Sequence, residues 1–196
     1  YCIAVTSGTS ALILALQALK IYYKDNFNVA KPNTFGDHVV TTSYNIAIPA
    51  LTFPATLNSA ILTGYNGVLA DVYSDDMLIN ISKDFVANNF IKGVIPVHLF
   101  GYPVDMDKIY QIHKSYKFFI LEDCCEAIGS KYKGKYVGTL GDIGAFSFYA
   151  SHPLAVSEYG CVVTNNEVLY SLMKSIKNHG RVGSNLEFNH KYIGYN

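Results

Sequence analysis

Short apolar segments alternate along the chain with stretches in which apolar residues recur at helical spacing. The apolar segments predict strands at residues 1–5, 46–48, 67–72, 93–98, 117–122, 145–149 and 160–164. The helical spacing predicts helices at residues 10–20, 54–62, 106–114 and 167–178. Strands that alternate with helices favour an α/β fold, a mostly parallel sheet flanked by helices. Residues 21–43, rich in Asn, Lys and Tyr, interrupt the pattern and are expected to form a surface excursion.

The composition limits the classes of function. The chain has 196 residues, half of them hydrophobic, which is enough for one domain with a sizeable core, or most of one. Its formal net charge is zero and it has no basic run, so neither nucleic acid nor a membrane is indicated as a partner. The apolar runs are far shorter than a membrane span and no signal peptide is visible, which favours a cytoplasmic protein. The four cysteines have no metal-ligand or disulfide-framework spacing, and Cys124 and Cys125 are interpreted as small buried residues at a strand end.

Polar or aromatic groups follow several predicted strands, at the end where parallel α/β sheets bind ligands. The segment TSGTS, residues 6–10, joins a strand to a helix. Gly8 allows a tight turn there, and the amides and hydroxyls that follow face an anion along the helix axis. The alternative role is a simple helix N-cap by Ser7 or Thr9. The segment PALTFPATLN, residues 49–58, places Phe53 where it suits either stacking on a flat ring or ordinary core packing.

Two acids end the strand predicted at residues 117–122. They lie in the segment ILEDCCEA, residues 120–127, directly after four apolar side chains. A carboxylate in such a place is unfavourable unless it is paired or solvated in a cleft. Glu122 is interpreted as a structural pair or a helix cap. His98, which precedes a predicted turn and helix start, is also interpreted as structural.

The segment GTLGDIGAFSFYASH, residues 138–152, resembles the catalytic segment of the DegT/StrS family of sugar aminotransferases, which depend on pyridoxal phosphate (PLP). In that family a lysine that carries the cofactor follows the serine by five residues. Here the serine is Ser147 and the fifth residue after it is His152, and no lysine lies between Lys135 and Lys174. A histidine moves protons but does not form the Schiff base with PLP that a lysine amine forms. The resemblance therefore implies a pyridoxal enzyme, and position 152 argues against an ordinary transaminase.

The resemblance extends over nearly the whole chain outside residues 21–43, and it implies how a cofactor phosphate is bound. TSGTS matches the family's phosphate-binding turn, so Gly8, Thr9 and Ser10 take that role, together with Ser147. The closing GYN supplies Asn196, which in the family reaches the phosphate in the neighbouring subunit's site. This implies a homodimer with a shared active site.

The same resemblance assigns the groups around the pyridine ring. Phe53 stacks on the ring, and Asp123 pairs with the protonated ring nitrogen, which keeps the ring an electron sink. Glu126 stands where a Gln or His often lies near the ring hydroxyl, a departure that resembles the dehydratase branch. No metal ligand is implied. Residues 1–196 would form the PLP-binding large domain of a fold-type I transferase. The sequence begins at Tyr1 within a strand pattern and ends at Asn196 within a motif. We therefore expect a fragment that lacks its N-terminal start and a small C-terminal domain.

A histidine-bearing branch of the family acts as a 3-dehydratase on nucleotide-linked 4-keto-6-deoxy sugars in cell-surface polysaccharide or deoxysugar biosynthesis. It uses the amine form of the cofactor, pyridoxamine phosphate (PMP), and His152 would be the base that removes a proton from the C4′ methylene of PMP. One alternative is a sugar aminotransferase of the same family. A second is a non-catalytic regulator that binds cofactor or a sugar nucleotide. The segment SEYG, residues 157–160, supports the regulator because the family has GEGG there and a tyrosine needs both room and a negative φ.

Overall fold

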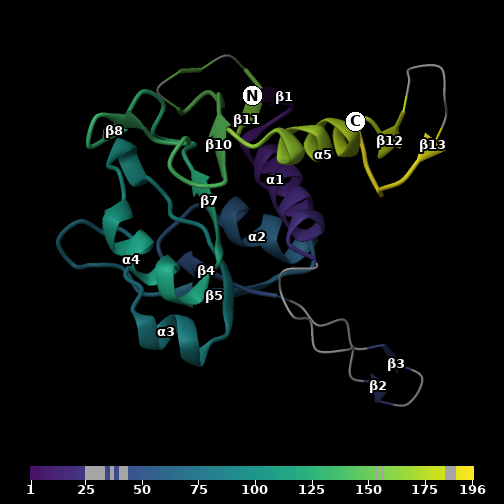
Figure 1. Cartoon of the computed structure of the whole chain (residues 1–196). Coiled ribbons are helices and arrows are strands. Elements are labelled where there is room, and N and C mark those ends of the chain that lie inside the picture. Colours follow the sequence, from purple (N-terminus) through teal and green to yellow (C-terminus); the bar gives the residue numbers. More distant parts are fainter. Residues whose placement is uncertain (25–33, 36–37, 40–43, 153, 156, 184–188) are drawn as a thin grey trace.

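Seven strands form one sheet at the centre of the computed structural model (Figure 1). The structure describes residues 1–24, 34–35, 38–39, 44–152, 154–155, 157–183 and 189–196. In spatial order the strands are β1 (Cys2–Val5), β11 (Gly160–Val163), β10 (Ile143–Ser147), β7 (Phe119–Asp123), β6 (Ile91–Val94), β4 (Asn45–Pro49) and β5 (Asn66–Ala70). β11 runs antiparallel to both of its neighbours, and the other four pairs are parallel. The prediction of a mostly parallel sheet is therefore confirmed.

Helices cover both faces of the sheet. One face carries α1 (Gly8–Tyr22), α2 (Pro54–Leu62) and α5 (Glu167–Lys177), and the other carries α3 (Lys83–Asn88) and α4 (Met106–Tyr116). β7 shows how the sequence serves both layers, because Phe119 and Leu121 pack into the core around α1 whereas Ile120 packs into the core around α4. A strand covered on both faces needs apolar side chains on each, and β7 has them at its first three positions, before Glu122 and Asp123. None of the described helices is both long enough and apolar enough to span a membrane.

The element boundaries differ from the predicted ones in ways that have local causes. The strand predicted at residues 93–98 ends at Val94 as β6, since Pro96 has no amide hydrogen to donate to a neighbouring strand. α3 was not predicted, because six residues are too few to show a helical period; Ser82 caps it by accepting a hydrogen bond from the Phe85 amide. Most of the excursion predicted at residues 21–43 lies outside the described residues.

Short strands complete the described structure. They form three two-stranded sheets: β2 (Thr34–Phe35) with β3 (His38–Val39), β8 (Lys131–Tyr132) with β9 (Lys135–Tyr136), and β12 (Arg181–Val182) with β13 (Asn189–His190). A single turn of 3-10 helix, Leu99–Gly101, follows β6. These elements lie outside the main sheet and do not change its order.

The sheet brings four strand ends to one edge. β1 and β10 both run antiparallel to β11, so β1 points the same way as β4, β7 and β10. The residues that follow or end these strands are Ser7, Thr52, Asp123 and Ser147, from four distant parts of the chain. Ligands bind at this edge in open α/β sheets.

Candidate active site

A cavity of about 370 Å³ opens at the carboxyl edge of the sheet, a volume suited to a cofactor or small ligand. Its lining combines hydroxyl groups, three carboxylates and one imidazole with apolar walls. It is formed by Ser7, Gly8, Thr9, Leu12, Thr52, Phe53, Ala55, Thr56, Val97, Leu99, Asp123, Cys125, Glu126, Ser147, Tyr149, Ser151, His152 and Glu158. Seven residues assigned to the site from the sequence thus line one cavity: Gly8, Thr9, Phe53, Asp123, Glu126, Ser147 and His152.

The start of α1 forms one wall of this cavity. Ser7 is the N-cap, and its hydroxyl oxygen accepts a hydrogen bond of 3.1 Å from the Ser10 amide. The hydroxyl of Ser10 lies 3.0 Å from that of Ser7 and 2.9 Å from that of Thr6, and Ser10 is not part of the cavity lining. The N-terminus of a fifteen-residue helix carries a partial positive charge and unpaired amides, which together favour a phosphate.

Gly8 is the point where this wall meets the end of β10. A Cβ atom at position 8 would lie 2.6 Å from Cβ of Ser147 and 3.0 Å from Sγ of Cys125. Only a glycine therefore lets the helix approach the serine this closely. Ser147 is buried, and its hydroxyl also accepts a hydrogen bond of 3.3 Å from the Tyr149 amide.

Replacing Gly8 with alanine is expected to disturb this approach. The added methyl group would push α1 away from β10, which we expect to lower the free energy of unfolding by about 1–3 kcal/mol. It would also weaken binding of the cofactor phosphate. Thermal denaturation with and without PMP measures both effects, and Gly129→Ala is the control, since a Cβ there meets nothing within 4 Å and only the left-handed backbone is strained. Equal stabilisation of the Gly8→Ala and unaltered proteins by PMP would contradict the expected loss of phosphate binding.

Asp123 lines the cavity at the end of β7. Its side chain is buried, with Oδ1 accepting a hydrogen bond of 3.2 Å from the Cys125 amide and Oδ2 one of 3.0 Å from the Thr56 hydroxyl. Burial and the neighbouring Asp123 carboxylate raise the pKa of the Cys125 thiol well above its usual range, so the thiol stays neutral beside the acid. A buried, oriented carboxylate of this kind suits a protonated ring nitrogen.

Cys125 departs from its predicted environment. Cys124 is buried, as predicted, whereas Cys125 is half-buried and lines the cavity between Asp123 and Gly8. The sequence signal that could have shown this is its position two residues beyond the end of a buried strand.

His152 reaches the cavity from the loop after β10. Its amide donates a hydrogen bond of 2.9 Å to the Tyr149 carbonyl oxygen, which closes a turn. Its ring is half-buried and meets the Tyr149 ring edge to face, with 6.2 Å between centroids and 70° between planes. The imidazole thus borders the same cavity as Asp123.

Phe53 and Glu126 line the mouth and the wall. Phe53 is the N-cap residue of α2, and 75% of its surface is exposed, which leaves the face of its ring available to a ligand. Glu126 accepts a hydrogen bond of 2.8 Å at Oε2 from the Phe100 amide, so its carboxylate supports the turn after β6 as well as bordering the cavity.

Asn196, which the family resemblance assigns to the cofactor phosphate, lies away from the cavity. It is exposed and does not line the cavity of its own subunit, so its role across a dimer stays a prediction.

Glu122 and His98 form a buried pair. Oε2 of Glu122 lies 3.0 Å from Nε2 of His98, and Nδ1 of His98 accepts a hydrogen bond of 3.0 Å from the Val104 amide. The structural interpretation of Glu122 and His98 is therefore confirmed.

In the SEYG segment the tyrosine avoids a positive φ, whereas a serine adopts one, which is uncommon for residues other than glycine. The residue with a positive φ is Ser157, at +66°, and Tyr159 is not among the described residues with positive φ. The Tyr159 side chain is exposed, so the structure has room for a tyrosine at a position where the family has glycine. Residues that the sequence did not single out also line the cavity, among them Glu158 of this segment, Thr52 and Thr56.

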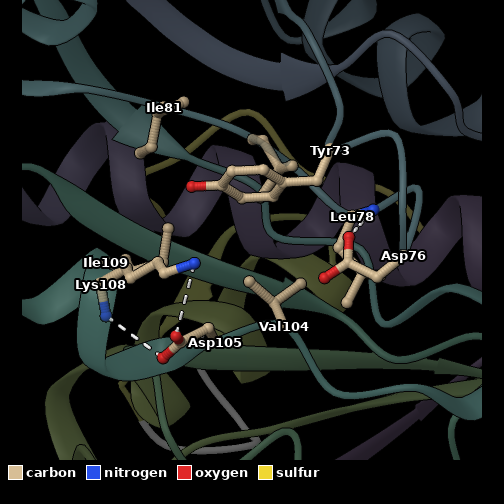
Figure 2. A pocket seen from close by; sticks show the side chains of 9 residues that line it. Tyr73, Asp76, Leu78, Ile81, Val104, Asp105, Lys108 and Ile109 are labelled. Atoms are coloured by element: carbon tan, nitrogen blue, oxygen red, sulfur yellow. Dashed lines mark hydrogen bonds and ion pairs between the residues drawn. The ribbon is translucent and has the colours of Figure 1, made fainter.

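A second cavity lies beside the start of α4 (Figure 2), and it is too small to compete as the site. Its volume of about 20 Å³ has room for about one water molecule. Apolar side chains including Leu78 and Val104 form much of its wall, and Lys108 lies 4.5 Å from the centre of the Tyr73 ring and 3.8 Å from Oδ2 of Asp105. These contacts describe surface packing.

The residues of the large cavity fit PLP or PMP. The hydroxyls and amides at the start of α1, with Ser147, suit a phosphate, and the closed approach at Gly8 shapes that end of the cavity. Asp123 suits the ring nitrogen. The sheet order, the antiparallel β11 and this donor set indicate the fold class of fold-type I PLP enzymes.

Comparison with known proteins identifies the family. The model of the DegT/DnrJ/EryC1/StrS aminotransferase family matches residues 1–196, so the chain belongs to this family. GDP-perosamine synthase of Escherichia coli O157:H7 is 38% identical over 197 residues, 100% of this chain and 49% of that protein. GDP-4-keto-6-deoxy-D-mannose 3-dehydratase of Yersinia pseudotuberculosis is 34% identical over 193 residues, 97% of this chain and 45% of that protein.

A solved structure agrees with this assignment. The E. coli GDP-4-keto-6-deoxy-D-mannose-3-dehydratase with bound hydrated PLP has a TM-score of 0.82 and 27% identity, covering 100% of this chain and 51% of that chain. The predicted family and fold class are thereby confirmed, and the predicted cofactor is the one bound in this related structure. The chain spans about half the length of the relatives it matches.

Proposed function

We propose that the protein is a PMP-dependent 3-dehydratase of nucleotide-linked 4-keto-6-deoxy sugars. The observation that carries the proposal is that His152 lines the cofactor cavity together with Asp123, at the position where the family resemblance expects a lysine. Six other residues assigned to the site line the same cavity, which favours a change of reaction over loss of function. The relatives that match nearly the whole chain include a protein named as a 3-dehydratase.

The cofactor would be held from both ends. The hydroxyls of Ser7, Thr9 and Ser147 would bind its phosphate, Asp123 would pair with its ring nitrogen, and Phe53 would cover its ring. When bound, PMP supplies an amine for the C4 ketone of the sugar and a ring that accepts electrons.

His152 would move the protons of the reaction. Imidazole acts as a general acid and base near neutral pH, so His152 can take a proton from C4′ and deliver one to the C3 hydroxyl as it leaves. Asp123 would hold the ring nitrogen protonated. The buried side chains of Leu12, Val97 and Leu99 line the same cavity and exclude water from it.

The proposal includes the partner and the substrate. Asn196 is exposed, and we place the partner subunit's Asn196 at the phosphate in a homodimer in the cytoplasm. A GDP-linked sugar is the first substrate to assay, because two relatives have names that contain GDP-linked sugars. Incubation of GDP-4-keto-6-deoxy-D-mannose with an excess of PMP should give a ketone that lacks the C3 oxygen, detected by mass spectrometry, and one PMP should be oxidised to PLP for each sugar reduced at C3. No conversion across a panel of nucleotide 4-keto-6-deoxy sugars would contradict the proposal.

A sugar aminotransferase is the second candidate. It is favoured by the 38% identity with GDP-perosamine synthase. That reaction would keep the C3 hydroxyl and replace the C4 ketone with an amine, so the same product analysis separates the two activities. A bound-PLP absorbance band removed by borohydride, with a modified lysine found by peptide mapping, would favour the aminotransferase.

A further inference from the structure

We infer that Thr56 and Thr52 are positioning residues for Asp123. Together they form a two-hydroxyl chain that fixes one oxygen of the carboxylate so that the acid faces the ring nitrogen of the cofactor. The inference rests on the proposed cofactor site, and it concerns residues that the sequence did not single out.

The hydrogen bonds set the order of the chain. The Thr56 hydroxyl donates to Oδ2 of Asp123 over 3.0 Å, and the hydroxyls of Thr52 and Thr56 lie 2.8 Å apart. A hydroxyl has a single proton, and that of Thr56 is used on the carboxylate. Thr52 therefore donates to Thr56, and both dipoles point toward the acid. Such consecutive hydrogen bonds strengthen one another where water is excluded.

The site is buried enough for these bonds to matter. Thr56 is 1% exposed and Asp123 is 5% exposed, so water does not replace a lost donor freely. Oδ1 of Asp123 is held from the other side by the Cys125 amide. The main chain of Asp123 is also fixed, because its amide donates to the Pro96 carbonyl and its carbonyl accepts from the His98 amide. Both oxygens then keep lone pairs for a donor in the cavity.

The placement on α2 links the acid to the ring-covering residue. Thr56 lies in the first turn of α2, and its amide donates a hydrogen bond of 3.1 Å to the Phe53 carbonyl oxygen. Pro54 begins the helix with a backbone angle already suited to it, which keeps this turn rigid. One helix turn therefore positions the aromatic ring against the face of the cofactor and the hydroxyl against its acid.

The test compares Thr56→Val with two matched variants. Valine keeps the shape and removes the hydroxyl, whereas Thr56→Ser keeps the hydroxyl. Thr63→Val is the control, because Thr63 is a buried threonine after the same helix whose hydroxyl donates only to the carbonyl oxygens of Ser59 and Ala60. The measurements are the dissociation constant for PMP and the pH at which the absorbance of bound PMP reports loss of the ring proton.

Thr56→Val should weaken PMP binding by about tenfold or more and move the absorbance transition to lower pH. Thr56→Ser should restore both, and Thr52→Val should shift both in the same direction by less. Thr63→Val should change neither, even if it melts at a lower temperature. If Thr56→Val binds PMP with the affinity and transition of the unaltered protein, the positioning role is wrong while the cofactor site stands. If the unaltered protein does not bind PMP, both the site and this role are wrong.

Discussion

Replacing His152 with asparagine is expected to reduce turnover of the nucleotide sugar by about 100-fold to 10,000-fold, the usual contribution of a general base. Asparagine keeps a polar side chain of similar size in the cavity but does not take up a proton near neutral pH. The hydrogen bonds of Asp123 and the close approach of Gly8 to Ser147 do not involve the His152 side chain, so the affinity for PMP should stay unchanged. Product formation and PMP titration measure the two quantities separately.

The control for this substitution is His179→Asn. His179 is exposed, and its φ of +56° is a conformation that asparagine adopts readily, so the fold should tolerate the change. Turnover should then match that of the unaltered protein. A His152→Asn protein that keeps full turnover would remove His152 from the mechanism.

Replacing Glu122 with glutamine is expected to lower the free energy of unfolding by about 3–5 kcal/mol, as when one partner of a buried charged network is removed. The amides of Leu140 and Gly141 donate to Oε1 at 2.7 Å and 2.6 Å, and that of Gly138 donates to Oε2 at 2.8 Å, where His98 also binds. A glutamine side chain offers one acceptor oxygen, and its NH₂ group would face donors. Urea denaturation of the cofactor-free protein measures the change.

Glu167→Gln is the control for the loss of a carboxylate. Glu167 is exposed in the first turn of α5, so its replacement should lower the free energy of unfolding by no more than about 1 kcal/mol. A loss at Glu122 as small as this would show that the buried carboxylate does not hold the loop at residues 138–141.

The local pattern predicted the seven strands of the main sheet and the helices α1, α2, α4 and α5, but not α3. Phe119, Ile120 and Leu121 are all apolar, which predicts a strand covered on both faces, and the structure confirms it. The predicted phosphate turn, ring acid and histidine meet in one cavity because parallel strands place their carboxyl ends at one edge. The helix at residues 54–62 was predicted, but its hydrogen bond from Thr56 to Asp123 was not, since the two residues lie 67 positions apart and no local pattern records their contact.

Some outcomes depended on backbone conformation. The tyrosine of SEYG raised a question about φ that the sequence left open, and the structure answers it by placing the positive φ at Ser157. Cys125 looked like a second buried thiol next to Cys124, and the chain direction after β7 turns it toward the cavity instead. Neighbouring residues beyond a strand end no longer alternate by a fixed period, so their exposure depends on the turn.

By itself the sequence determined the α/β class and the order of most strands and helices along the chain, because these depend on local periodicity, and its resemblance to the family placed His152 at the lysine position. Tertiary structure alone decided which groups meet. It joined Glu122 to the loop at residues 138–141, Thr56 to Asp123, and Gly8 to Ser147. Hydrogen bonds and close packing act over a few ångströms, so contacts between distant parts of a chain exist only once the sheet has aligned them.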